Sequence, residues 1–309
     1  MRQGFREYPK RYELLETYLA MFLRTSSLKQ FNSIGAAENI LSHFALSFVS
    51  LLYLWSKINS NILMAEKYTE NHSIACYEAD ANQLLKPTAM LDWMQEVAGR
   101  DATKLGFGYD HLIQNNTAWV LARTHVRFHQ YPKWRDNVQL QTWHKGAFKV
   151  LYLRDFQLFN EAGEALVSAT TSWLIIDMNT RRMVRNPELA SSPDTCIFEH
   201  AIEEPADKII IPHDVEPTLS GTHKVVWSDI DTMAHVNNVK YVGWALDVID
   251  ETILKEKPLK EILVNYDAEV LLGEEVKLYS IYQDTDEGLT VYIQGIVEEK
   301  TKFSVKLVF

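Results

Sequence analysis

The residues best suited to carry chemistry lie in one short run, Trp227–Trp244, which reads WSDIDTMAHVNNVKYVGW. In this run a cluster of polar residues comes directly before an apolar segment with helical spacing. A histidine can transfer protons near neutral pH, and a carboxylate beside it can orient the ring or share its charge. Asp231 and His235 are therefore a candidate acid–base pair.

The helix expected after this cluster would contribute a second chemical element. Its first backbone N–H groups have no partner inside the helix, and the helix dipole places partial positive charge there. A carbonyl oxygen bound at that end would be polarised as negative charge develops on it, as in an oxyanion hole. The spacing alone leaves a simpler alternative open, in which Asp231 is an N-cap and His235 is a surface residue.

The first half of the chain beyond about residue 70 is predicted to hold one helix and several strands. Pro87 suits the start of a helix, and apolar residues then recur every three or four positions until Gly106 and Gly108 end it. Apolar and polar residues alternate over 120–128, which indicates a half-buried strand. The predicted strands are 74–77, 120–128, 138–143, 150–159 and 165–177, with a hairpin turn at 160–163.

The second half repeats this order of elements. Asp80 matches Asp229 at an offset of 149, and Val138 matches Val276 at an offset of 138. A helix is predicted from about Val236, and its apolar face is Val239, Val242, Leu246, Ile249 and Ile253. The predicted strands are 222–227, 262–271, 275–283, 289–298 and 302–309. An apolar helix against an antiparallel sheet, formed twice, is an α+β pattern.

Composition and charge narrow the class of protein. The chain has 309 residues, of which 47% are hydrophobic, and this length is enough for two folded domains. Its net charge of −10 argues against a nucleic-acid partner. Two cysteines, Cys76 and Cys196, make no disulfide framework, so we expect a cytoplasmic protein.

Four segments are predicted along the chain: an N-terminal extension at 1–63, a first domain at 64–185, a linker at 186–217 and a second domain at 218–309. The extension carries seven basic and four acidic residues, a balance of +3, which leaves −13 on the remainder. Its apolar run 40–55 has 16 residues, whereas a membrane-spanning helix needs about 20. Membrane contact through this run is therefore the less favoured interpretation, and the role of the extension and the oligomeric state stay open.

The run Trp227–Trp244 resembles the signature of the acyl-ACP thioesterases, a plant-type family that also occurs in bacteria. The similarity covers the whole run, HVNNVKYVGW included, and extends over about residues 70–309. In the first half, the stretches similar to this family are WVLAR at 119–123, YPKWRD at 131–136 and QTW at 141–143. The resemblance implies a tandem (double) hotdog fold of the α+β class, with two long helices each packed against an antiparallel sheet.

The resemblance also implies an activity and a substrate. Members hydrolyse the thioester bond of fatty acyl-ACP, which releases free fatty acid and ends chain elongation. The implied partner is an acyl carrier protein carrying a fatty acyl chain, and no cofactor or metal is expected because a thioester is already activated. Two alternatives stay open: a hotdog 3-hydroxyacyl thioester dehydratase or hydratase, and a non-catalytic acyl-thioester-binding protein.

Carried over position by position, the family's catalytic residues fall on Asp231, His235 and Glu269. Glu269 would attack the thioester as a nucleophile or activate a water molecule, and its apolar neighbours predict partial burial on a strand. The asparagine that is usual between the aspartate and the histidine is Met233 here, which removes one hydrogen-bonding amide. The position after the glutamate, often cysteine in plant members, is Val270, so no cysteine nucleophile is expected there.

Three further sets of residues follow from the expected reaction. The backbone amides that would hold the oxyanion are those of Val236 and Asn237. The acyl chain needs an apolar tunnel, which the first-half helix would line with Met90, Trp93, Met94 and Val97. A carrier protein of this kind is acidic, and the tightest basic group for docking it is Arg181, Arg182 and Arg185, with Arg123, Arg127, Lys133 and Arg135 as a second choice.

Overall fold

The computed structural model describes residues 65–185, 195–286 and 288–309. By its internal contacts the chain divides into two units, 1–62 and 63–309, and all described residues belong to the second unit. The predicted extension, with its apolar run at 40–55, lies outside the described residues, and so does part of the predicted linker. None of the helices in the described part is both long and apolar enough to cross a membrane.

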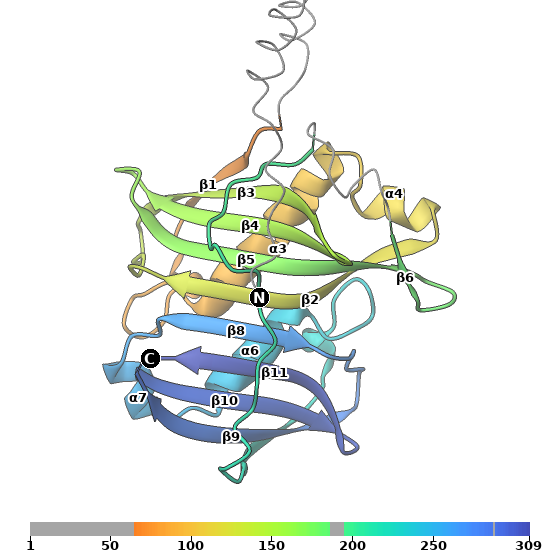
Figure 1. Ribbon diagram of the computed structural model, residues 1–309. Helices are drawn as coiled ribbons and strands as arrows, with labels where there is room; N and C mark the ends of the chain where they lie inside the picture. The colour runs from red at the N-terminus through yellow and green to blue at the C-terminus, as the bar shows by residue number, and fades with distance from the viewer. Residues whose placement is uncertain (1–64, 186–194, 287) are drawn as a thin grey trace, which may run out of the picture. The chain divides into compact units, whose positions relative to one another are not determined.

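One antiparallel sheet of eleven strands runs through both halves of this unit (Figure 1). Ten strands follow one another in the order β1-β3-β4-β5-β2-β8-β11-β10-β9-β7, and β6 pairs with β5. Their bounds are Tyr68–Ser73 (β1), Thr117–Phe128 (β2), Asn137–Phe148 (β3), Leu151–Asn160 (β4), Ala165–Asp177 (β5), Met183–Val184 (β6), Thr218–Lys224 (β7), Glu261–Tyr266 (β8), Glu275–Thr285 (β9), Gly288–Val297 (β10) and Lys300–Val308 (β11).

The two halves are joined by the pairing of β2 with β8, which places Arg123 opposite Asn265 and Arg127 opposite Glu261. The expected antiparallel sheet of each half is therefore present, but the two sheets are continuous. Within its own half, each of β2 and β8 is an edge strand, and an unpaired edge has free N–H and C=O groups. Pairing these two edges satisfies both rows of backbone groups at once.

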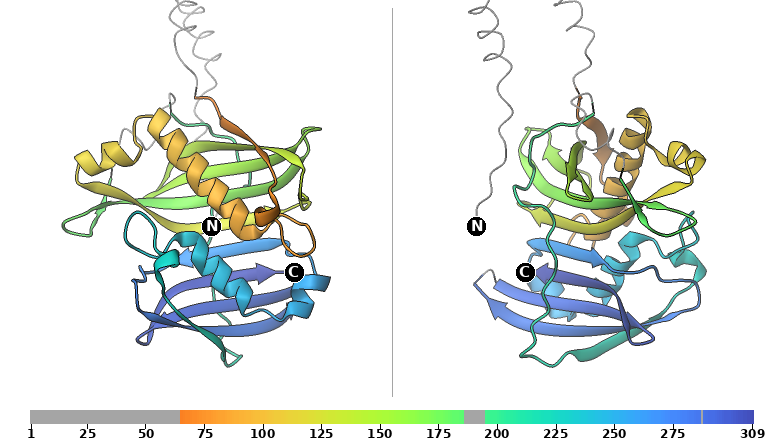
Figure 2. Two further views of the ribbon diagram at one scale, coloured as in Figure 1. Left: turned by 180° about the vertical axis from the view of Figure 1, so that it is seen from behind. Right: turned by 45° about the vertical axis from the view of Figure 1, so that its right-hand side comes forward.

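Two helices, α3 (Pro87–Lys104) and α6 (Asn238–Asp247), lie on the same face of the sheet (Figure 2). The prediction of a helix after Pro87 is confirmed, whereas the second helix is shorter than expected. Asp250 accepts a hydrogen bond from the Thr252 backbone N–H at 2.8 Å and so caps a separate helix, α7 (Glu251–Glu256). The remaining α-helix of the described residues is α4 (Tyr109–Gln114).

The first strand of each half lies earlier in the chain than expected. The predicted strand at 74–77 is wrong, and the one at 222–227 is right only over 222–224, because turns of 3-10 helix occupy Cys76–Glu78 and Trp227–Asp229. In each turn the last residue is acidic and its carboxylate accepts a backbone hydrogen bond, Ala75 N–H to Glu78 and Val226 N–H to Asp229. These local bonds compete with a strand ladder and end the strands at Ser73 and Lys224.

The hydrophobic core is continuous across the two halves and lies between the helices and the sheet. From α3 it includes Met90, Leu91, Trp93, Met94 and Val97. From α6 and the second-half strands it takes Val242, Val264, Ile293 and Phe303, among others. Burial of this shared apolar surface is what holds the two halves as one unit.

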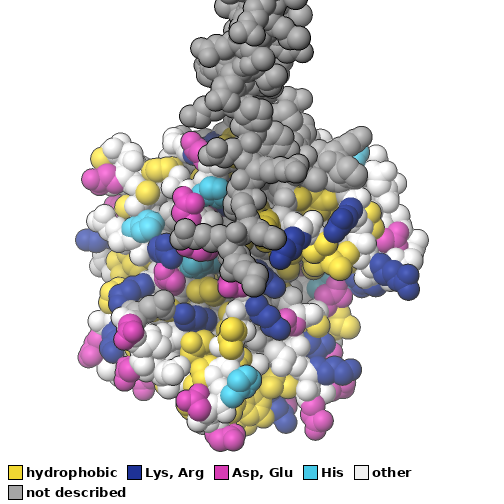
Figure 3. Space-filling view, in the orientation of Figure 1, with side chains coloured by type: hydrophobic (Ala, Val, Ile, Leu, Met, Phe, Trp, Pro, Cys, Tyr) yellow, Lys and Arg dark blue, Asp and Glu magenta, His cyan; other side chains and the backbone are white. Residues whose placement is uncertain are grey.

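The described part of the linker runs from residue 195 across the opposite face of the sheet (Figure 1). It is fixed there by hydrogen bonds to the strands: Ala201 N–H donates to Asp155 at 2.7 Å, and Ile209 N–H donates to Asn265 at 2.8 Å. Acidic and basic side chains are interspersed over this face (Figure 3). The linker is thus a packed part of the fold.

The buried Asp155 carboxylate should be essential for stability. It accepts hydrogen bonds from the Ala201 amide and from Lys145 Nζ, whose side chain is only 3% exposed. We expect Asp155→Ala to lower the free energy of unfolding by about 3 to 5 kcal/mol, because it leaves Lys145 buried without its partner. Urea denaturation would measure this. Glu251→Ala, which breaks an exposed ion pair with Lys255, is the control and should change stability very little.

Stability should also depend on acid through Glu261, at the seam between the halves. His125 Nε2 lies 3.3 Å from one oxygen of this carboxylate and Arg127 Nε donates to the other at 2.6 Å. The hydrogen bond from His125 and then that from Arg127 outweigh burial and lower the pKa of Glu261 to about 2. A folded-state pKa below the unfolded value stabilises the protein above about pH 4.5. That stability is lost as the pH falls toward 2.

We therefore expect Glu261→Gln to flatten the fall in stability between about pH 5 and pH 2. Denaturant titrations at a series of pH values would measure it. The exposed Glu256→Gln variant is the control and should keep the wild-type acid dependence. An unchanged acid dependence in Glu261→Gln would contradict the assignment.

Candidate active site

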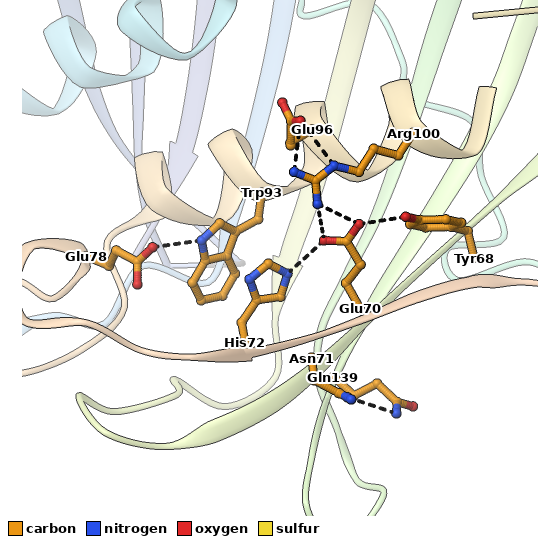
Figure 4. A network of polar contacts seen from close by, with 9 residues as sticks. All are labelled: Tyr68, Glu70, Asn71, His72, Glu78, Trp93, Glu96, Arg100 and Gln139. Atoms are coloured by element: carbon orange, nitrogen blue, oxygen red, sulfur yellow. Dashed lines mark hydrogen bonds and ion pairs between the residues drawn. The ribbon is translucent and has the colours of Figure 1, made fainter. Parts of the chain in front are cut away.

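The two halves repeat one another residue by residue around their first strand and helix. His72 stacks on Trp93 with ring centroids 4.4 Å apart, and Trp93 Nε1 donates to Glu78 (Figure 4). In the second half His223 stacks on Trp244 at 4.3 Å, and an acid again joins the cluster, because His223 Nε2 lies 2.8 Å from Asp229. Each second-half residue lies 151 positions after its counterpart.

This offset corrects the alignment of the halves. Asp80 corresponds to Asp231, and not to Asp229, which is the counterpart of Glu78. The offset of 138 for the strands is confirmed, because His72 pairs with Val138 and His223 pairs with Val276. The offsets of 151 and 138 differ because the helix and the strand that follows it are shorter in the second half, with 10 and 6 residues in α6 and β8 against 18 and 12 in α3 and β2.

Both halves build the same loop in front of their helix. Asp80 accepts hydrogen bonds from the backbone N–H groups of Asn82 and Leu84, and Asp231 accepts one from Met233 at 2.8 Å. One loop residue in each half has a left-handed backbone, with φ of 62° at Gln83 and 63° at Ala234. The loops close with equivalent bridges, Ala79–Leu85 and Ile230–Val236. The scaffold is duplicated, so the difference between the halves lies in side chains.

The second half alone places an acid–base pair on this scaffold. His235 Nε2 lies 3.2 Å from Glu269 Oε2, and the two side chains are 26% and 43% exposed. The corresponding positions of the first half, by the offsets above, are Leu84 and Tyr131. Leu84 has no ionisable group, and burial raises the pKa of Tyr131, so neither residue can exchange a proton with a substrate near neutral pH.

Glu269 differs from expectation in its location. Strand β8 ends at Tyr266, so Glu269 lies in the loop beyond it, and its side chain is exposed and not partly buried among apolar groups. Val270, the next residue, points inward and is fully buried. Glu269 therefore points outward, where Arg181 Nη1 donates to Oε1 at 3.1 Å and Nη2 donates to Oε2 at 3.4 Å.

Asp231 stabilises the loop that carries His235. Its carboxylate accepts from the Met233 amide, and its own N–H donates to the His235 carbonyl oxygen at 2.9 Å. It thereby holds the loop in the conformation that presents the imidazole. The Asp–His spacing thus arises from a turn that Asp231 caps, with His235 at its far end.

The predicted oxyanion donors are already engaged. Val236 N–H donates to the Val270 carbonyl oxygen at 3.1 Å, and Asn237 N–H donates to that of Asp229 at 2.9 Å. Asn237 is instead the N-cap of α6, and its side chain accepts from Val239 N–H. The next amide, of Asn238, begins α6 and forms no hydrogen bond within the described residues. Asn238 is therefore a better placed donor than either predicted residue.

A cavity of about 280 Å³ lies between α3, α4 and strands β2, β4 and β5 of the first half. Its walls are largely apolar and aromatic, and include Phe107, Leu112, Trp119, Tyr152 and Trp173. It extends to the second-half loop, where Asp231, Thr232, Met233 and Asn238 line it. His235 and Glu269 are not lining residues, but His235 lies between Met233 and Asn238 in the chain. The cavity and the acid–base pair therefore meet at this loop.

The face of α3 that lines the cavity differs from the predicted one. Met90, Trp93 and Val97 are buried in the core, and Met94 borders only a second space of about 20 Å³. The helix lines the cavity with Gln95, Ala98, Gly99 and Ala102. Large side chains fill the space they face, whereas a stripe of small ones leaves room. The small residues at these helical spacings are the signal in the sequence that could have located the cavity.

Some of the basic residues proposed for carrier docking form hydrogen bonds or ion pairs within the protein. Arg182 and Arg185 are exposed, whereas Arg181 is paired with Glu269. In the second group, Arg127 pairs with Glu261 and Arg123 donates to the Ala206 carbonyl oxygen. Over residues 65–185, 195–286 and 288–309, no three His, Cys, Asp or Glu side chains cluster as a metal site would need.

Two family models match this chain, one over each half. Residues 65–191 match the acyl-ACP thioesterase N-terminal domain, and residues 213–307 match the C-terminal domain. A chloroplastic palmitoyl-acyl carrier protein thioesterase of Gossypium hirsutum is 33% identical over 234 residues, which cover 72% of this chain and 56% of the relative. A chloroplastic oleoyl-acyl carrier protein thioesterase of Coriandrum sativum is 28% identical over 242 residues, covering 73% and 66%. The chain thus spans between half and two thirds of these relatives.

Solved structures share the fold. An acyl-ACP thioesterase from Bacteroides thetaiotaomicron superposes with a TM-score of 0.70 at 23% identity, covering 78% of this chain and 96% of the other. The 12:0-ACP thioesterase from Umbellularia californica gives a TM-score of 0.70 at 22% identity, covering 78% and 93%. The α+β prediction of a tandem hotdog is confirmed. With both of its domains matched in order over most of the described residues, the chain belongs to the acyl-ACP thioesterase family.

Proposed function

We propose that the protein hydrolyses the thioester bond of fatty acyl-ACP, releasing free fatty acid and so ending chain elongation. The observation that carries this proposal is the pairing of His235 with Glu269 at 3.2 Å, next to the loop where an apolar cavity ends. A fatty acyl thioester has an apolar chain that suits the cavity and a polar reacting carbonyl that suits the loop. The names of the relatives support the same substrate class.

The reaction needs attack on the carbonyl carbon, cleavage of the carbon–sulfur bond and a proton for the departing sulfur. Glu269 either accepts a proton from the attacking water or attacks first itself and is then released by water. His235, in contact with Glu269, is placed to pass a proton to the thiolate. The Asn238 N–H, at the positive end of the α6 dipole, is placed to stabilise the oxyanion.

The carrier protein would approach from the solvent side, where His235 and Glu269 are partly exposed. The substrate arm could then reach the loop while the acyl chain enters the first-half cavity. Arg182 and Arg185 are exposed near Arg181 and are the remaining candidates for docking an acidic carrier. A dehydratase or hydratase would leave the thioester intact, and so would a binding protein, so release of free thiol from a saturated acyl-ACP distinguishes a hydrolase from both alternatives.

The role of Glu269 predicts the effect of removing it. We expect Glu269→Ala to lower kcat by at least about 10²-fold, the range for a positioned acid–base group. Hydrolysis of a panel of acyl-ACPs, followed by thiol release, would measure this. Asp267→Ala is the matched control, because Asp267 is an exposed carboxylate in the same loop, and this variant should retain most of its activity. Near-normal turnover by Glu269→Ala would refute the assignment.

The cavity predicts how chain-length preference can be changed. A side chain added at Gly99 meets open space, because apart from its chain neighbours and the backbone of its own helix no heavy atom lies within 4 Å of an ideal Cβ there. Gly99→Leu should fold and project into the cavity, lowering kcat/KM for longer acyl chains more than for shorter ones. Competition assays with acyl-ACPs of graded length would show the shift. Lys104→Leu adds leucine at an exposed position of the same helix, outside the cavity, and should leave the preference unchanged.

A further inference from the structure

Arg181 comes from the first half and reaches the acid–base pair of the second half. It lies in the turn between β5 and β6, 88 residues before Glu269 in the chain. Its guanidinium donates to both carboxylate oxygens of Glu269, at 3.1 Å and 3.4 Å. A two-pronged contact of this kind fixes the plane of the carboxylate as well as its position.

The turn that carries Arg181 is held by many hydrogen bonds. The Asp177 carboxylate accepts from the backbone N–H groups of Asn179 and Thr180 and from the Thr180 hydroxyl. Arg181 N–H donates to the Asp177 carbonyl oxygen at 2.8 Å, and Asp177 N–H donates to that of Arg182 at 2.9 Å. Arg181 itself has a left-handed backbone, with φ of 57°. These hydrogen bonds fix the backbone position from which the Arg181 side chain extends.

Glu269 needs such a partner because little else restrains its side chain. The Glu269 carbonyl oxygen accepts from Lys302 Nζ at 2.9 Å, which holds the backbone only. The side chain is 43% exposed and has the rotamer freedom of a surface glutamate. Arg181 contacts both oxygens, while His235 lies against one of them, Oε2. With Arg181 in place, Oε1 and Oε2 keep a constant orientation toward the imidazole.

We propose that Arg181 is a positioning residue for the reaction: it holds the Glu269 carboxylate in the orientation needed for attack or base catalysis. The active centre is thus completed by the first half of the chain. This inference rests on the proposed hydrolase function. It replaces carrier docking as the role of Arg181, because its guanidinium is engaged with Glu269, although the side chain is exposed like those of Arg182 and Arg185.

Arg181→Gly is the variant of choice, since glycine adopts a left-handed backbone without strain. The assay compares two substrates, a fatty acyl-ACP and the same acyl group on pantetheine without the carrier protein. We expect kcat to fall roughly tenfold to a hundredfold on both substrates with little change in KM, the scale of a misplaced catalytic group. Arg181→Lys should recover part of kcat, and free guanidinium should partly restore Arg181→Gly.

Lys149→Gly is the matched control, because Lys149 is also an exposed cation with a left-handed backbone (φ of 60°), and it should keep the wild-type kcat on both substrates. A rise in KM confined to acyl-ACP in Arg181→Gly would mean carrier docking and would overturn the inference. A normal kcat on both substrates in that variant would also overturn it. If wild-type protein released no thiol from either substrate, the proposed function itself would fail, and that result is separate from any effect of Arg181.

Discussion

The pairing of β2 with β8 is the interaction on which the rest of this structure depends. It makes one sheet of two halves and aligns their helices on one face, so that a single core is buried between them. The cavity of the first half consequently ends at the loop 231–235 of the second. The same alignment brings the β5–β6 turn within reach of Glu269. Each half by itself would lack part of the site.

The structure is a duplication in which the scaffold was kept and the side chains diverged. Both halves retain the histidine–tryptophan stack, the acid that closes the 3-10 turn and the capped loop before the helix. These features are fixed by backbone hydrogen bonds and close packing, which tolerate few alternatives. The positions of His235 and Glu269 are occupied by Leu84 and Tyr131 in the other half, where Tyr131 packs against the hydrophobic core. Chemistry could therefore be confined to one copy without a change of fold.

Helix α3 shows how one element separates packing from binding. Its large apolar side chains fill the core, and the stripe containing Ala98, Gly99 and Ala102 faces the cavity. Packing density in a protein interior leaves few voids, so a cavity of about 280 Å³ requires small side chains along one wall and a rigid frame around it. The aromatic residues of α4 and the strands supply that frame. The helix thus stabilises the fold with one face and leaves space with another.

Local patterns in the sequence were enough for the order of elements, the repeat, the α+β class and the candidate pair of Asp231 and His235, whereas Glu269 followed only from the family resemblance. Residue spacing and turn propensity depend on neighbours in the chain, so they can be recognised from the sequence alone. They could not place the Asn238 amide, the cavity-lining face of α3 or the contact of Arg181 with Glu269. The contact of Arg181 with Glu269 joins residues 88 positions apart in the chain, and the availability of the Asn238 amide depends on which backbone hydrogen bonds its neighbours form. Both are determined by how the strands pack into one sheet.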